Sequence, residues 1–339
     1  MKRFGLGFVG CGGYGQSLAN AAAKSEKLLP VACWDVVPEN AEKLAVKSGA
    51  RTCSTIDELL AIEEVRGVVI ASPNNAHREN AEAAAAAGKH VFVDKPIANT
   101  IEDALAIIEV CERAGVVLAV GHNSRRMAGH RKVKEMIDSG AIGKPVTVEA
   151  NFSHAGGLGL KADQWRFTRE GCPGLPLMQL GVHFADTAQY LLGDITEVSS
   201  FMSHVAIPAD NDDVTVSLLR FEGGLLGYLG SNYATPSVYY VNVYGTGGNL
   251  YCERGGHLLY RAADSNDCRP IPLEPVDSQI EELEEFAECA LSGAKPEVDG
   301  TAALKALAVV RAAIRSNEQR RPVTVAEVIE EGRTRLDRT

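Results

Sequence analysis

The sequence predicts a two-domain α/β protein, with an N-terminal doubly wound parallel sheet of the Rossmann type and a C-terminal α+β domain built on a large, predominantly antiparallel sheet. Its 339 residues exceed the roughly 250–300 that one core usually serves. Short apolar strands alternate with helices at first, whereas from about residue 146 strands follow one another with glycine-rich turns. We therefore expect a dinucleotide-binding domain at 1–122 and a substrate-binding and oligomerisation domain at 123–339.

The composition is that of an ordinary globular protein, with 45% apolar and 23% charged residues. A net charge of −10 argues against nucleic acid or an anionic membrane as a partner. The eight cysteines are scattered without a C-x-x-C pair, which predicts free, mostly packed thiols and no metal site. No apolar run reaches the roughly 18 residues of a membrane helix, and the glycine-rich start lacks a signal peptide's apolar centre. The sequence therefore predicts a cytoplasmic protein.

The first strand, "FGLGFVG", runs into "GCGGYG" and then into a helix of small residues, "GQSLANAAAK". Gly10, Gly12 and Gly15 are spaced as G-x-G-x-x-G, which suits a tight turn, close approach to a pyrophosphate, and close packing of helix on strand, respectively. The helix N-terminus then offers N–H groups to the phosphates. We expect this loop, including Gly13 and Tyr14, to bind a dinucleotide.

The second strand, "LPVACWD", ends in Asp35, 20 positions after Gly15. This is about where a carboxylate binds the adenosine ribose hydroxyls. The same carboxylate would repel a 2′-phosphate, and the following "VVP" has no arginine to receive one. The sequence therefore favours NAD over NADP.

Three further strands, in "GVVIASP", "HVFVDKP" and "VVLAVGH", end in polar clusters. Because parallel strands present ligands at their carboxyl ends, these clusters are candidates for a cleft. His77, at the start of the next helix, is expected to position the loop before it. The predicted cofactor residues of these segments are Ser72, Pro73, Asn74, His77, Asp94, Lys95 and Asn123.

The second domain contains an apolar predicted helix, 177–192, with one polar stripe. Gln179, His183 and Asp186 recur at i, i+4 and i+7 and would share a face. The stripe is either a satisfied network in a core or the wall of a reaction chamber. The other candidates for substrate contact are His154, Trp165, Arg166 and Arg125, with the neighbouring Arg126 expected in solvent.

The rest of this domain alternates apolar and polar residues in hairpins, with turns at "EGG" and "GTGG". The chain is expected to close with two helices, at about 278–291 and 300–316. The exposed sheet face is a candidate oligomerisation surface, although alternating strands also fit a monomer.

Seven motifs together resemble the Gfo/Idh/MocA group of NAD(P)-dependent oxidoreductases, in that family's order and approximate spacing. They are "GCGGYG", "SPNNAH", "DKPIA", "GHNSRR", "WRF", "GVHFAD" and "YGTGGNL". The resemblance covers nearly the whole chain. It implies a Rossmann domain followed by an antiparallel sheet through which dimers or tetramers assemble. It also implies substrates such as sugars, polyols, nucleotide sugars or cyclic diols.

The resemblance also matches individual positions of the family's motifs to residues of this sequence. The lysine of the family's E-K-P motif falls on Lys95, with Asp94 in place of the more usual glutamate. The histidine of its D-x-G-x-H segment falls on His183. The aspartate of that segment is replaced by Gln179, which is a departure, while Asp186 matches a common acidic position and is expected to pair with a basic neighbour.

These positions suit the oxidation of a secondary alcohol, in which a hydride leaves carbon and a proton leaves oxygen. Lys95 would polarise the hydroxyl or help to accept its proton, and His183, as a histidine suited to proton transfer near neutral pH, would relay the proton or take it directly. Gln179 offers hydrogen bonds without charge and would orient the substrate or His183. Two alternatives stay open: a lyase or glycoside hydrolase that oxidises a sugar only transiently with tightly bound NAD, and a nucleotide-binding regulator without catalysis.

Overall fold

The computed structural model describes residues 3–254 and 257–338. The chain forms two compact units, and each contains two segments of sequence. The first unit comprises Met1–Asn123 and Asp277–Leu304, and the second comprises Ser124–Val276 and Lys305–Thr339.

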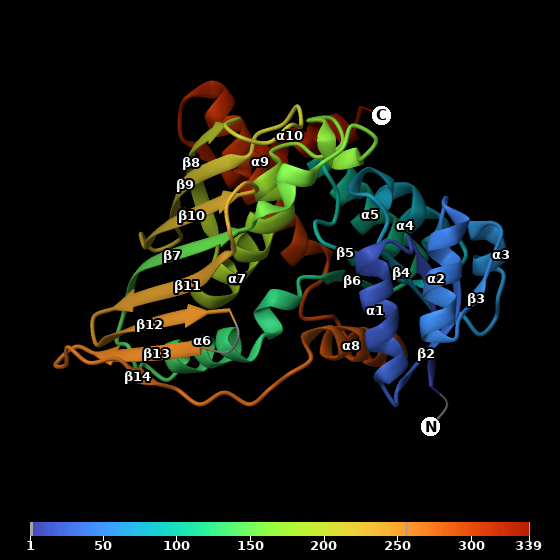
Figure 1. Ribbon diagram of the computed structural model, residues 1–339, viewed down its shortest axis with the longest axis horizontal. Coiled ribbons are helices and arrows are strands. Elements are labelled where there is room, and N and C mark those ends of the chain that lie inside the picture. Colours follow the sequence, from blue (N-terminus) through green and yellow to red (C-terminus); the bar gives the residue numbers. More distant parts are fainter. Residues whose placement is uncertain (1–2, 255–256, 339) are drawn as a thin grey trace. The chain divides into compact units, whose positions relative to one another are not determined.

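The first unit is built on a six-stranded parallel sheet with the order β3-β2-β1-β4-β5-β6, which confirms the predicted Rossmann topology (Figure 1). Its strands are β1 (Phe4–Val9), β2 (Leu28–Trp34), β3 (Arg51–Thr52), β4 (Gly67–Ile70), β5 (His90–Asp94) and β6 (Leu118–Gly121). Its helices are α1 (Gly13–Lys24), α2 (Pro38–Ser48), α3 (Ile56–Leu60), α4 (His77–Ala86), α5 (Ile101–Ala114), α8 (Ser278–Ser292) and the first turn of α9 (Gly300–Gln319).

Helix α5 illustrates how local sequence sets these boundaries. It begins after Thr100, because the Thr100 hydroxyl accepts a hydrogen bond from the backbone N–H of Asp103 at 3.1 Å. It ends at Gly115, whose φ of 65° is left-handed backbone that favours glycine. Between these ends Ala104, Leu105 and Ile107 are buried and form the helix's packed face.

Helix α8 belongs to the first unit, although it follows the second unit's sheet in sequence. The Phe286 ring lies edge-on to Phe4, with centroids 6.0 Å apart, and to Phe92, at 5.7 Å. Leu283 and Ala287 are buried in the same apolar cluster. The predicted division at residues 122 and 123 therefore misplaces segment 277–304, whose apolar face packs against the N-terminal sheet.

The second unit is built on a nine-stranded sheet with the order β14-β13-β12-β11-β7-β10-β9-β8-β15. Among the strands that the structure describes in it, only β7 and β10 pair in parallel. The predicted turns at "EGG" and "GTGG" join β9 to β10 and β11 to β12. The strands are β7 (Pro145–Ser153), β8 (Ile195–Ser203), β9 (Val214–Phe221), β10 (Leu226–Asn232), β11 (Val238–Gly245), β12 (Gly248–Glu253), β13 (His257–Ala262), β14 (Arg269–Pro270) and β15 (Val323–Thr324).

The helices of the second unit are α6 (Ala128–Asp138), α7 (Val182–Leu192), most of α9, and α10 (Val325–Leu336). The predicted closing helices correspond to α8 and α9, but the chain ends with a third, α10. This helix begins after Thr324, whose hydroxyl accepts from the backbone N–H of Glu327 at 3.2 Å. Helix α6 contacts β12, and helix α7 contacts β7 (Figure 1).

All eight cysteines are free thiols, and seven of them are buried, as predicted. In the part of the chain that the structure describes, no helix combines the length and apolar character needed to span a membrane.

Candidate active site

The glycine loop after β1 leaves its backbone open on one side. Gly10 has a φ of 87°, and a Cβ atom there would lie 2.4 Å from the backbone nitrogen of Ser72. A Cβ atom at Gly15 would lie 2.1 Å from the Gly10 carbonyl oxygen, whereas one at Gly12 or Gly13 would meet nothing within 4 Å. Gly10 and Gly15 therefore allow the tight turn, and the open side at Gly12 and Gly13 fits the close approach of a diphosphate.

The Asp35 carboxylate is fixed at the edge of this loop. One of its oxygens accepts a hydrogen bond from the backbone N–H of Cys11 at 2.6 Å, and the other accepts from that of Val37 at 2.8 Å. Helix α1 begins at Gly13, and no side chain caps it at Gly12. An uncapped helix N-terminus beside an oriented carboxylate fits the phosphates and ribose hydroxyls of a dinucleotide.

His77 joins two of the strand-end loops. Its Nε2 lies 3.0 Å from the Ser72 carbonyl oxygen, and its Nδ1 lies 3.1 Å from that of Pro96. Burial of the ring lowers the pKa of His77, while the carbonyl oxygens of Ser72, Ile97 and Pro96 at its two nitrogens act in the opposite direction. In the same region, the Asn74 amide donates to the Asn99 side chain at 3.1 Å. His77 thus fixes the loop after β4 against the loop that follows Lys95.

Lys95 directly follows β5, and its backbone N–H donates to the Asp94 carboxylate at 2.8 Å. Burial raises the pKa of the Tyr14 hydroxyl, as do the nearby charges of Asp94 and Glu282.

The Asn123 amide donates to the Ser278 hydroxyl of α8 at 3.3 Å. No local sequence pattern indicates this contact with α8, because 155 residues separate the two partners in the chain.

In the second unit, the polar stripe does not begin on an α-helix. Residues Leu177–Gly181 form a π-helical turn that leads into α7, so the predicted i, i+4, i+7 face is not a regular one. The Gln179 carbonyl oxygen accepts from Arg166 Nε at 2.9 Å, and its amide donates to Cys172 Sγ at 3.4 Å. Such turns inside helices occur frequently at functional sites.

The other two residues of the stripe have separate partners. His183 Nδ1 lies 3.1 Å from the Ser124 hydroxyl, and both residues are buried. Asp186 forms a bidentate ion pair with Arg125, in which Arg125 Nε donates to one oxygen at 2.9 Å and Nη2 donates to the other. The expected basic partner of Asp186 is therefore Arg125. The expectation that Arg126 is solvated is wrong, because its residue is 4% exposed.

The remaining substrate candidates lie on short turns. The Arg166 guanidinium stacks over the Trp165 ring at 4.3 Å, so Trp165, Arg166 and Gln179 form one group. His154 accepts a hydrogen bond from the backbone N–H of Gly156 at 3.0 Å, and its ring centroid lies 4.6 Å from that of Tyr233. In the part of the chain that the structure describes, no three His, Cys, Asp or Glu side chains are grouped as metal ligands.

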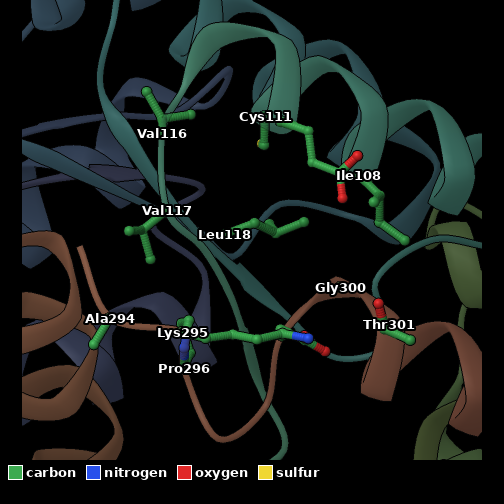
Figure 2. A pocket seen from close by; sticks show the side chains of 12 residues that line it. Ile108, Cys111, Val116, Val117, Leu118, Ala294, Lys295, Pro296, Gly300 and Thr301 are labelled. Atoms are coloured by element: carbon green, nitrogen blue, oxygen red, sulfur yellow. The ribbon is translucent and has the colours of Figure 1, made fainter.

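The first unit also contains a pocket of about 200 Å³ between α5, β6 and the segment that leads into α9 (Figure 2). Its lining is mostly apolar, with Lys295 and Asp299 forming an ion pair within it. None of the predicted site residues lines this pocket.

Comparisons with known proteins identify both units. The model of the oxidoreductase family with an NAD-binding Rossmann fold matches residues 4–122, and the model of the GFO/IDH/MocA C-terminal domain matches residues 130–251. A protein of Desulfitobacterium hafniense DCB-2, proposed to be an NADPH-dependent oxidoreductase, has a crystal structure with a TM-score of 0.93 and 37% identity, covering 97% of this chain and 99% of that one.

Two curated relatives span nearly the whole chain. The 1,5-anhydro-D-fructose reductase of Ensifer adhaerens is 27% identical over 93% of this chain and 96% of its own length. The 2,7-anhydro-N-acetylneuraminate hydratase of Escherichia coli K12 is 29% identical over 95% of this chain and 97% of its own length. The chain is a member of the Gfo/Idh/MocA family of NAD-binding oxidoreductases.

Proposed function

We propose that this oxidoreductase transfers a hydride between NAD and a secondary alcohol or ketone of a sugar, polyol or related cyclic diol. The observation that carries the proposal is that a chain of this family retains both Lys95 and His183, side chains suited to moving the alcohol proton. The relative from Ensifer adhaerens, named as a reductase of an anhydro sugar, supports the substrate class.

Each proposed role follows from the chemistry of the side chain. Bound NAD supplies the hydride acceptor. Lys95 donates a hydrogen bond to the reacting hydroxyl and stabilises negative charge on its oxygen. His183 takes the hydroxyl proton during oxidation and returns it during reduction. Gln179 orients its neighbours as an uncharged partner of Arg166, at the position where the family motif carries an acid.

Asp35 is proposed to select NAD. Two backbone N–H groups hold its carboxylate, and residues 36–38 supply no cation for a 2′-phosphate. The kcat/KM with NAD should therefore exceed that with NADP. Asp35→Asn should bring the two kcat/KM values closer together, because it removes the negative charge that repels the 2′-phosphate of NADP. Equal kcat/KM values for the two cofactors with the unaltered protein would contradict this assignment.

The proposed reaction is tested by NADH formation from NAD with a panel of sugars, polyols and cyclic diols. With a responding substrate, Lys95→Met and His183→Gln should each lower kcat by about 10²–10⁴-fold. Lys144→Met and His257→Gln, at exposed positions, serve as matched controls and should retain activity. Full activity in His183→Gln would show that His183 is not the proton acceptor.

The relative named as a hydratase favours one second candidate, in which the sugar is oxidised only transiently and tightly bound NAD is regenerated. The two candidates differ in one observable quantity. Transient oxidation changes the sugar without net NADH, whereas dehydrogenation releases one NADH for each sugar oxidised.

We also infer a cytoplasmic homodimer or homotetramer that forms through the second unit's sheet. The free thiols support a reducing compartment. One face of the sheet exposes large apolar side chains, with Phe201 79%, Leu218 60% and Leu226 50% accessible. Phe201→Lys combined with Leu218→Lys should convert the oligomer to a monomer in light scattering, and an unchanged mass would exclude this face.

A further inference from the structure

Arg166 differs from two other arginines of the second unit in the balance of its charge. Arg125 forms its ion pair with Asp186, which is 1% exposed. Arg169 donates to both carboxylate oxygens of Asp212, at 2.9 and 3.1 Å. In the part of the chain that the structure describes, no carboxylate lies within ion-pair distance of the Arg166 guanidinium. One positive charge therefore remains at Arg166.

Uncharged groups hold this guanidinium in place. Arg166 Nε donates to the Gln179 side-chain oxygen at 2.9 Å, and Gln179 is 6% exposed. The guanidinium also lies over the Trp165 ring, 4.3 Å from its centroid. Among the described residues, no acceptor is bonded to Nη1 or Nη2, so these donors are available to a ligand.

The turn that carries Arg166 is itself anchored. A Cβ atom at Gly171 would lie 1.8 Å from the Trp165 carbonyl oxygen, so the two ends of the turn approach as only glycine allows. The fully buried Asn211 amide donates to the Thr168 carbonyl oxygen at 3.1 Å. The guanidinium therefore has a fixed position before a ligand binds, which lowers the entropic cost of binding.

The partner of Arg166 lies on the same segment as the proposed proton acceptor. Gln179 precedes His183 by about one helical turn, on the π-helical turn that leads into α7. One turn corresponds to a rise of about 5 Å. An acceptor for the guanidinium and a hydroxyl for His183 therefore fit on one sugar-sized molecule.

We propose that Arg166 selects substrates that carry a carboxylate, such as uronic acids, by binding that carboxylate through Nη1 and Nη2. The inference rests on the proposed function and names the substrate class of the same site. A carboxylate matches the planar donors of a guanidinium and balances a single positive charge. A phosphate carries nearly two negative charges, and the nearby Arg169 is already paired with Asp212. The charge balance therefore favours a carboxylate over a phosphate.

Equilibrium binding to the NAD-loaded protein tests this selection without turnover. Titration calorimetry compares D-glucuronate, D-galacturonate and further sugar acids with their neutral amides, which have nearly the same shape. At least one acid should bind about 10–100-fold more tightly than its amide, as expected of a hydrogen bond to a charged group. Equal affinities for every acid and its amide, or no binding of any acid, would overturn the proposal. Tighter binding of hexose phosphates than of the acids would also overturn it.

Two variants remove the unbalanced charge by opposite changes. Arg166→Met removes the guanidinium, whereas Gln179→Asp supplies a carboxylate that pairs with it. Each should bring the affinities for acid and amide close together, while Arg166→Lys should retain part of the preference. Arg333→Met, at an exposed position of α10, is the matched control and should keep the parent preference. An unchanged preference in Arg166→Met would refute the assignment, and if that variant fails to fold, Gln179→Asp decides alone.

Kinetics separate this inference from the proposed reaction. Acids should have a lower KM than their amides with a smaller change in kcat, because Arg166 binds a group remote from the reacting carbon. If acids bind through Arg166 but no member of the panel yields NADH, the binding preference stands and the proposed dehydrogenation fails. If neutral sugars yield NADH with the same kcat/KM as the acids, the proposed function stands and the selection by Arg166 is refuted.

Discussion

Lowering the pH from 7 to 5 should destabilise the second unit through His130. This ring is 1% exposed, and its burial lowers the pKa to about 4 from the ordinary 6.5. The hydrogen bond to Ser124 and the charge of Asp186 act in the opposite direction but are smaller effects. As pH falls below 6.5, the unfolded chain binds a proton that the folded chain does not accept until about pH 4. The stability contributed by the neutral buried ring is therefore complete above pH 6.5 and is lost between these two values.

The size of the loss follows from the two pKa values. At pH 5 the unfolded imidazole is almost wholly protonated, while the buried one is still mostly neutral. The resulting difference in the free energy of unfolding between pH 7 and pH 5 is about 2 kcal/mol.

Urea unfolding at the two pH values measures this loss. In a Trp34→Phe background, the fluorescence of Trp165 reports on the second unit. His130→Asn keeps an amide donor for the Ser124 carbonyl but removes the titration, so this variant should lose about 2 kcal/mol less than its parent between pH 7 and pH 5. His257→Asn, on an exposed strand position, should behave like the parent. The same pH sensitivity in His130→Asn and its parent would refute the reasoning.

Three further predictions concern packing, ion pairing and thiol exposure. Phe286→Ala should cost about 3–5 kcal/mol in urea unfolding because the ring is fully buried, whereas Leu291→Ala, at a residue 58% exposed, should change stability by less than about 0.5 kcal/mol; equal effects would contradict the placement of α8. Asp186→Leu should cost about 3–5 kcal/mol in the same assay by leaving the buried Arg125 without its carboxylate, and adding Arg125→Met should recover part of that loss; additive losses would show that the pair is not coupled. A thiol reagent should modify one of the eight cysteines rapidly in the native protein, and Cys268→Ser should abolish the rapid phase; more than one rapidly reacting thiol would contradict the burial pattern.

The sequence was sufficient to predict those features of the fold that neighbouring residues determine. The loop at Gly10 has a left-handed φ and a close approach of backbone to backbone that only glycine allows. The spacing of the glycines in the sequence therefore predicts this loop. Thr100 and Gly115 delimit α5 in the same way. The alternation of buried and exposed side chains on β9 likewise reflects a sheet with one packed face.

The errors concern contacts between residues far apart in sequence. Helix α8 packs on the first sheet through Phe286, which no local pattern around residues 278–292 distinguishes from packing on the second. Arg126 was expected in solvent because an arginine in a polar run is usually exposed, yet tertiary packing buries it. The π-helical turn at Leu177–Gly181 changes the geometry of the polar stripe without changing its spacing in the sequence.

The most direct test of the proposed reaction follows a deuterium label placed on the reacting carbon of a responding sugar or polyol. Direct hydride transfer predicts that the deuterium appears on the nicotinamide ring of NADH released to solution, with one labelled NADH formed for each ketone. Conversion of the sugar without labelled NADH in solution, or no conversion with any member of the substrate panel, would contradict the account.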